Sequence, residues 1–74
     1  MTWQDHIRID PNIRFGKPCI KGTRIAVRDI LSWLASEMSM EEILSDFPEL
    51  TRADLLAALA YAAHRDETAR ILTA

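Results

Sequence analysis

Cysteine, glycine and proline are scarce in this sequence. One cysteine, two glycines and three prolines occur in 74 residues. A lone cysteine excludes a disulfide-stabilised scaffold and is typical of a reducing compartment and of a buried, inert thiol. A domain of this length buries only about 60% of its unfolded surface, so its core is marginal. We therefore expect one domain, residues 1–74, that gains stability by self-association.

Long hydrophobic runs are also missing. No stretch is long and apolar enough to span a bilayer, and the first residues lack the apolar core of a signal peptide. No linker, repeat or low-complexity tract divides the chain. We expect a cytoplasmic protein with no membrane partner.

The residue groupings that catalysis requires are absent as well. His6 and His64 are remote in sequence, and neither stands in a metal-ligand spacing with Cys19. Gly16 and Gly22 are too far apart to form a phosphate-binding loop. The sequence therefore predicts no catalytic residue, no metal and no cofactor, so we expect a protein that is not an enzyme.

The charge is small but unevenly distributed. The formal net charge is −2, with a balance of +3 over residues 1–33 and −5 over residues 34–74. An anionic partner should therefore meet the N-terminal third, because long-range attraction follows the local sign of charge. A solvated surface of mixed charge is the alternative interpretation.

The segment Gly16–Val27 mixes features that no simple helix or strand pattern explains. It holds both glycines, the cysteine, a proline and three cations. Its spacing predicts a tight hairpin in which Cys19–Ile20 pairs with Arg24–Ala26 and Gly22 takes a positive φ. A short strand at Ile7–Ile9 should precede it, so that residues 7–27 form a strand and hairpin segment.

From Val27 onward the hydrophobic period becomes helical, and residues 28–65 predict a three-helix unit. The first helix carries an apolar face of five residues: Val27, Ile30, Leu31, Leu34 and Met38. Trp33 lies at the polar edge of this face, where it is either partly covered by the N-terminal strands or free for a partner. Ser39 and Glu42 predict a capping box for the second helix, and Pro48 predicts its end.

The third helix is predicted to begin at Thr51, with Asp54 completing a weaker capping box. Its main apolar face is expected to be Leu55, Leu56, Leu59 and Ala63. The opposite face carries Ala57, Ala58 and Tyr61, which we predict as a dimer or partner interface together with Trp33. The alternative is that alanine is simply a good helix former. The tail, residues 66–74, should extend this helix or form a short extra one.

Three short helices at this spacing resemble a helix-turn-helix unit. Thr51 and Arg52, at the start of the third helix, are then candidates for DNA contact, although one arginine is little for reading bases. Phosphate contacts are better assigned to the basic residues of the N-terminal third, namely Lys17, Lys21, Arg24 and Arg28.

Several segments together resemble one known family, the domain-of-unknown-function family 433. The similar segments are Ile9–Pro11, Gly16–Ile25, Ser39–Leu44, Phe47–Thr51 and Ala57–Ala62. The family more often has proline where Ala26 stands and glycine where Glu37 stands. The resemblance implies a mainly α, homeodomain-like fold with small N-terminal strands, and a homodimer.

The same resemblance implies a role as the antitoxin of a bacterial type II toxin–antitoxin pair. The partner would be a PIN-like ribonuclease toxin, and operator DNA would be bound to repress the protein's own operon. The alternative hypothesis is a dimeric protein-interaction module that binds no DNA.

Overall fold

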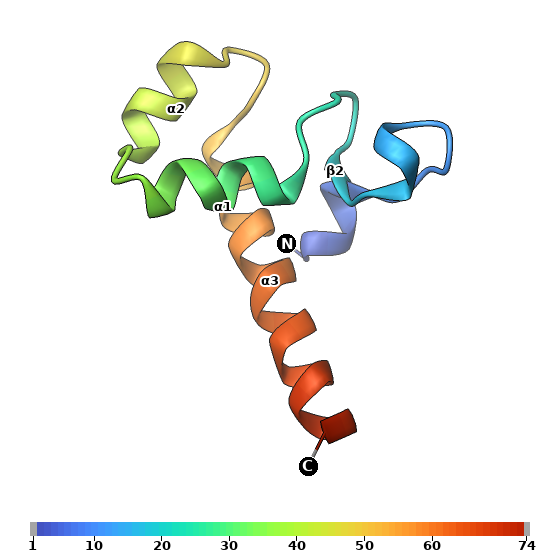
Figure 1. The fold of residues 1–74 in the computed structure, drawn as a ribbon. Helices are drawn as coiled ribbons and strands as arrows, with labels where there is room; N and C mark the ends of the chain where they lie inside the picture. Colours follow the sequence, from blue (N-terminus) through green and yellow to red (C-terminus); the bar gives the residue numbers. More distant parts are fainter. Residues whose placement is uncertain (1, 74) are drawn as a thin grey trace.

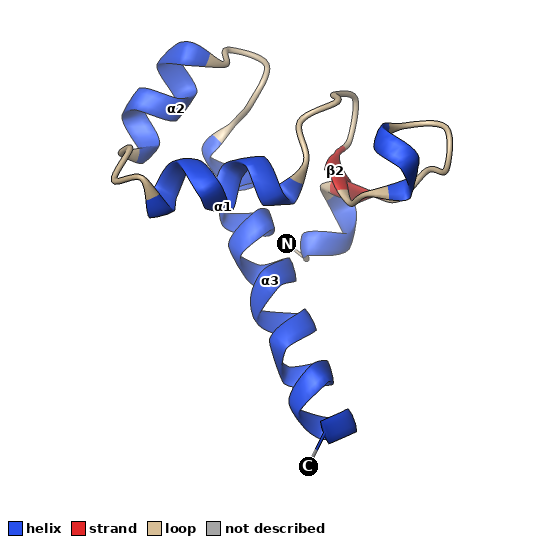
Figure 2. Ribbon diagram, in the orientation of Figure 1, coloured by secondary structure: helices blue, strands red, loops and turns tan. Residues whose placement is uncertain are grey.

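The computed structural model describes residues 2–73, with side chains through residue 67. It is mainly helical, with a two-stranded antiparallel sheet before three helices, and this confirms the predicted fold class (Figures 1 and 2). In chain order the elements are the 3-10 turn η1 (Trp3–Asp5), β1 (Ile7–Arg8), the turn η2 (Arg14–Gly16), β2 (Cys19–Ile20), α1 (Val27–Ala35), α2 (Met40–Asp46) and α3 (Arg52–Thr73).

The sheet differs from the predicted hairpin in its pairing partner. β2 pairs along its length with β1, so that Ile7 lies opposite Ile20. The predicted pairing with Arg24–Ala26 is limited to an isolated bridge between Cys19 and Ala26. Gly22 lies in the turn between Cys19–Ile20 and Arg24–Ala26. Its φ of +79° agrees with the predicted positive φ at this position.

The end of α1 is a Schellman motif. The Met38 N–H donates to the Trp33 carbonyl at 3.1 Å, and the Glu37 N–H donates to the Leu34 carbonyl at 3.0 Å. Glu37 occupies the left-handed position of this motif with a φ of +69°. The usual glycine is therefore replaced by a residue with a Cβ at the point where the helix must stop.

Both predicted capping boxes are confirmed. The Ser39 hydroxyl accepts from the Glu42 N–H at 3.1 Å, and the Glu42 carboxylate accepts from the Ser39 N–H at 3.0 Å. Thr51 and Asp54 form the same reciprocal pair at 3.2 and 3.0 Å. These bonds satisfy N–H groups that have no partner within the helix, which fixes where α2 and α3 begin. α2 ends at Asp46, before Pro48 as predicted.

The orientation of α3 corrects the sequence prediction. Ala57 and Ala58 are buried, with exposures of 1% and 0%, whereas Leu56 and Leu59 are 41% and 38% exposed. The face predicted to point outward thus packs into the core, which is formed by Ile7, Ile20, Val27, Ile30, Ile43, Leu50, Leu55, Ala58 and Tyr61. α1 and α3 make extensive contact, and small side chains let two helices approach closely. Ala57, Ala58 and Tyr61 are therefore not an exposed interface.

Trp33 packs against the residue that follows α2. Its ring stacks on that of Phe47, with centroids 4.3 Å apart and an interplanar angle of 12°. The residue after α2 covers one face of the indole, and Trp33 is among the partly buried side chains packed against the core. Trp33 therefore joins the end of α2 to α1 within the chain.

The C-terminal residues continue α3 as one helix to Thr73, which is the first of the two predicted alternatives. Figure 1 shows this helix leaving the body of the molecule at its C-terminal half. Ala74 lies outside the described residues.

Candidate interaction surfaces

The segment around Phe15 is a left-handed turn, which we call the Phe15 turn (residues 13–17). Arg14, Phe15 and Gly16 have φ values of +52°, +59° and +82°. The Gly16 N–H donates to the Ile13 carbonyl at 3.1 Å, and the Lys17 N–H donates to the Arg14 carbonyl at 3.2 Å. Positive φ is uncommon outside glycine and costs free energy, so two such residues in succession require support from elsewhere.

Arg14 supplies that support. Its Nη1 donates to the Arg24 carbonyl at 2.8 Å and to Asp29 Oδ2 at 3.0 Å. Asp29 also accepts from the Ala26 N–H at 3.1 Å, so it joins the turn to the start of α1. The result is a fixed turn that holds Phe15 in solvent at 98% exposure. Sequence reasoning did not select Phe15, because an exposed aromatic in a turn has no periodic pattern.

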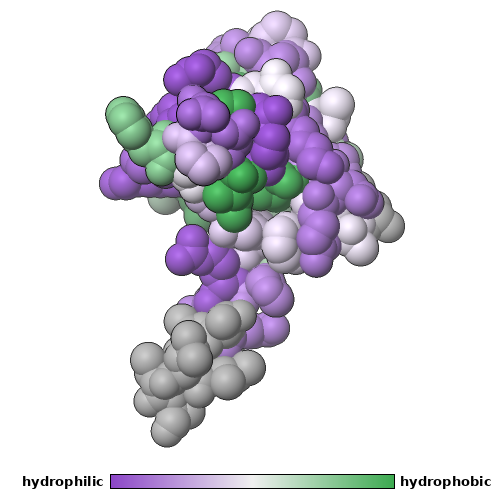
Figure 3. Space-filling view, turned by 90° about the vertical axis from the view of Figure 1, so that its right-hand side faces the viewer, coloured by the Kyte–Doolittle hydropathy of each residue, from purple (hydrophilic) through white to green (hydrophobic). Residues whose placement is uncertain are grey.

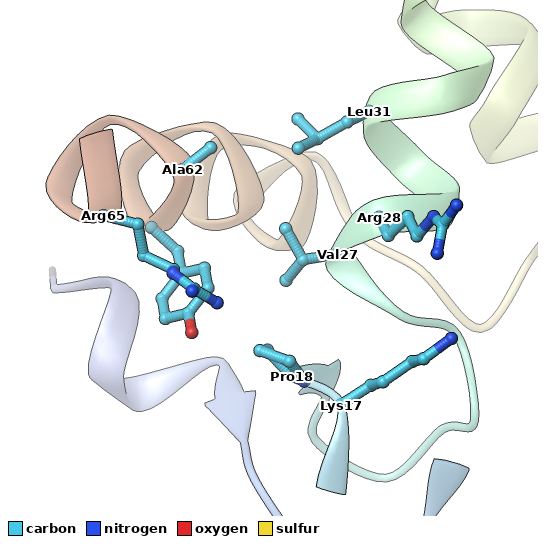
Figure 4. A pocket seen from close by; sticks show the side chains of 8 residues that line it. Lys17, Pro18, Val27, Arg28, Leu31, Ala62 and Arg65 are labelled. Atoms are coloured by element: carbon cyan, nitrogen blue, oxygen red, sulfur yellow. The ribbon is translucent and has the colours of Figure 1, made fainter. Parts of the chain in front are cut away.

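A pocket of about 380 Å³ lies between the end of the Phe15 turn, α1 and α3. We call it the cationic pocket. Its lining is Lys17, Pro18, Val27, Arg28, Leu31, Tyr61, Ala62 and Arg65. Figure 4 shows Val27 inside it, with Lys17 and Arg28 on one side and Arg65 on the opposite side. No carboxylate belongs to this lining among the described residues, so the pocket has an apolar floor and a positive rim.

The structure brings together only some of the residues predicted to contact DNA. Lys17 and Arg28 meet at the cationic pocket. Lys21 and Arg24 flank Gly22 in the turn that follows β2. All four cations are exposed, and none forms an ion pair with the side chains that the structure describes.

Thr51 and Arg52 lie elsewhere in the fold, at the start of α3. The Thr51 hydroxyl is engaged in the capping box, where it accepts from the backbone of Asp54. Arg52 is exposed at the first position of the helix. The outward positions that follow are apolar through Ala63, so the first turns of this helix present few donors for reading bases.

The outward face of α3 is a row of apolar residues at helical spacing. We call this row, Leu56, Leu59, Ala60 and Ala63, the α3 stripe; all four residues are exposed. A second exposed hydrophobic region lies on the side of the molecule formed by the N-terminal segment. Figure 3 shows hydrophobic side chains gathered in the middle of that face and surrounded by hydrophilic ones. The most exposed large apolar side chains of this segment are Ile9 at 59% and Phe15 at 98%.

Other kinds of site receive less support. The described side chains bring together no group of three or more His, Cys, Asp or Glu that could hold a metal ion. Cys19 is buried at 1% exposure, and His6 Nδ1 lies 2.8 Å from Asp54 Oδ1. None of the helices in residues 2–73 combines the length and apolar character needed to cross a bilayer.

Comparisons with known proteins place the chain in a family whose function is open. Residues 7–62 match the family model described as protein of unknown function, DUF433. The fold is similar to the 2.00 Å crystal structure of a DUF433 member protein from Anabaena variabilis ATCC 29413, with a TM-score of 0.81 and 32% sequence identity. The alignment covers 88% of this chain and 64% of that protein. The comparison with curated proteins returned no match.

Proposed function

The chain belongs to the DUF433 family, whose function is unknown, and we propose from its surfaces that it is an antitoxin. In this proposal it is a cytoplasmic homodimer that binds and neutralises a PIN-like ribonuclease toxin. The observation that carries the proposal is the α3 stripe, an exposed apolar row on a helix that projects from the body.

The α3 stripe suits recognition of a helix by a protein groove. Leu56 and Leu59 are spaced to enter such a groove as consecutive anchors. The next turns of the helix carry the acidic residues Asp66 and Glu67, and residues 34–74 have a charge balance of −5. An RNA-cleaving toxin needs a basic surface to hold its substrate, and charge complementarity would direct the antitoxin to that surface.

The test is co-expression with the product of the neighbouring gene, which the proposal expects to be a PIN-like toxin. We expect the wild-type chain to restore growth and to co-purify with the toxin. A Leu56→Lys/Leu59→Lys variant should lose both properties, because two charges would enter an apolar contact. The matched control is Ser32→Lys/Ser45→Lys, which adds the same charge at exposed positions of α1 and α2. Growth arrest that the wild-type chain does not relieve would reject the antitoxin role.

Binding to operator DNA is the second function we propose, through a helix-turn-helix arrangement. It is supported by the exposed cations Lys17, Lys21, Arg24 and Arg28, which could contact phosphates. Thr51 and Arg52 would add contacts at the start of α3. The alternative is a dimeric protein-interaction module without DNA binding, which is favoured by the apolar outward face of α3.

Fluorescence anisotropy with DNA from upstream of the gene separates these two alternatives. If DNA is bound, log K should fall linearly with log salt concentration, since bound phosphates release counterions. Lys21→Ala/Arg24→Ala should then reduce the slope by about two, roughly one unit per lost phosphate contact. Arg52→Ala reports on the start of α3. Absence of sequence-specific binding at low salt would favour the interaction module.

A further inference from the structure

We propose that the cationic pocket is the docking site for Phe15 of a second copy of this chain, and that the two copies exchange Phe15 reciprocally. This inference rests on the homodimer in the proposed function and identifies its contact surface. It concerns a different surface from the α3 stripe, so one chain could hold its copy and its toxin at the same time.

Phe15 has the properties of an anchor. Its side chain is 98% exposed, and it sits on a turn with successive positive φ values. The turn is fixed by Arg14 through bonds of 2.8 and 3.0 Å to Arg24 and Asp29. An aromatic ring held in place before binding loses little conformational entropy on binding. The strained turn therefore holds an apolar side chain in solvent, outside the core of its own chain.

The cationic pocket has the properties of the receiving site. Its volume of about 380 Å³ is large enough for a phenyl ring. Pro18, Val27 and Leu31 supply apolar contacts from one side, and α3 supplies Tyr61 and Ala62 from the other. The floor is therefore formed by rigid elements, as a preformed binding site requires.

Cation–π attraction is compatible with an aromatic occupant of the pocket. Three cations, Lys17, Arg28 and Arg65, surround an apolar floor that has no carboxylate among its described residues. Cations favour the electron-rich face of an aromatic ring. Arg65 already lies over the ring of Tyr61, with 5.9 Å between its Cζ and the ring centroid. A phenyl ring entering the pocket would meet the remaining cations in the same manner.

The position of the two features favours exchange between identical copies. Phe15 and the pocket residue Lys17 belong to the same short turn. A two-fold symmetric contact requires that anchor and receiving site lie near one another on one face, so that each copy gives and receives. Segment 14–18 carries the anchor together with two of the pocket residues, Lys17 and Pro18, so anchor and receiving site are adjacent in the chain.

The first experiment is analytical ultracentrifugation of the wild type, Phe15→Ala and Ile9→Ala. Phe15→Ala should raise the dimer dissociation constant roughly 100-fold or more, because two buried phenyl rings are lost per dimer. Ile9→Ala removes another exposed apolar side chain from the N-terminal segment and should leave the constant nearly unchanged. Both variants should keep the wild-type circular dichroism spectrum, since neither side chain is in the core. An unchanged constant for Phe15→Ala would overturn the proposal, as would a monomeric wild type.

The second experiment places the photo-crosslinker benzoylphenylalanine at position 15. Copies labelled with ¹⁵N are mixed with unlabelled copies, and crosslinked peptides are identified by mass spectrometry. We expect crosslinks between copies to peptides containing Val27, Leu31 or Ala62. Crosslinks between copies that map only to other peptides would overturn the pocket assignment.

Toxin co-purification separates this inference from the proposed function. Phe15→Ala should still bind the toxin, because the α3 stripe is intact. If Phe15→Ala remains dimeric but loses the toxin, Phe15 docks on the toxin and the proposal is wrong. If the variant is monomeric and the wild type binds no toxin, the contact between copies is supported and the antitoxin role is rejected.

Discussion

Individual residues with positive φ show two different uses of backbone strain. Arg14 and Phe15 are held by side-chain bonds to the start of α1, and they display an aromatic ring. Glu37 instead ends a helix, and its left-handed conformation serves only the Schellman motif. Because the Glu37 side chain is exposed and has no such support, its strain should be removable at no cost to the fold.

We predict that Glu37→Gly stabilises the protein by about 1 kcal/mol, because glycine adopts positive φ without steric cost. The measurement is the urea unfolding midpoint followed by circular dichroism. Ser36→Gly is the matched control: Ser36 has a φ of −88°, so glycine there gains nothing and should cost about 0.5–1 kcal/mol. Equal effects at both positions would contradict the argument.

At the scale of the elements, local chemistry made the helix boundaries predictable. The pairs Ser39–Glu42 and Thr51–Asp54 fix the starts of α2 and α3, and these signals need no tertiary information. The rotation of α3 was not predictable in this way. Both of its faces are apolar, so hydropathy alone could not decide that the alanines, rather than Leu56 and Leu59, pack inward.

We predict that Ala58→Leu destabilises the protein by about 1–3 kcal/mol, because it overpacks the core beside α1. Ala60→Leu makes the same chemical change at an exposed position of α3 and should alter stability by less than about 0.5 kcal/mol. Thermal unfolding of the two variants measures the difference. A larger loss for Ala60→Leu would mean that α3 is rotated as the sequence first indicated.

The candidate sites depended on contacts between distant parts of the chain, and the sequence predicted them only in part. Composition marked Lys17 and Arg28 as exposed cations. It could not predict that they would meet Arg65 of α3 across an apolar floor. The left-handed conformation at Phe15 is equally non-local, because it depends on Arg14 reaching Asp29 across 15 positions of sequence.

For the whole molecule, the decisive packing joins the N-terminal segment to the last helix. Trp3 lies edge-on to Tyr61, with ring centroids 4.9 Å apart, and 5.3 Å from the ring of His64. His6 Nδ1 lies 2.8 Å from Asp54 Oδ1, linking residues 48 positions apart. A chain with a small core depends strongly on such contacts. We therefore expect the N-terminal turn and α3 to unfold together.

We predict that Trp3→Ala lowers the free energy of unfolding by about 2 kcal/mol, since a half-buried indole loses part of the transfer energy of a fully buried one. For a domain of this size the total is only about 4–11 kcal/mol, so the loss is a large share. Urea titration followed by far-UV circular dichroism and, through the remaining Trp33, by fluorescence should give coincident transitions for the variant. Ile9→Ala, which removes an apolar side chain that is 59% exposed, is the control and should leave the free energy of unfolding nearly unchanged. Separate transitions in the two signals would show that the N-terminal turn is not part of the same cooperative unit as α3.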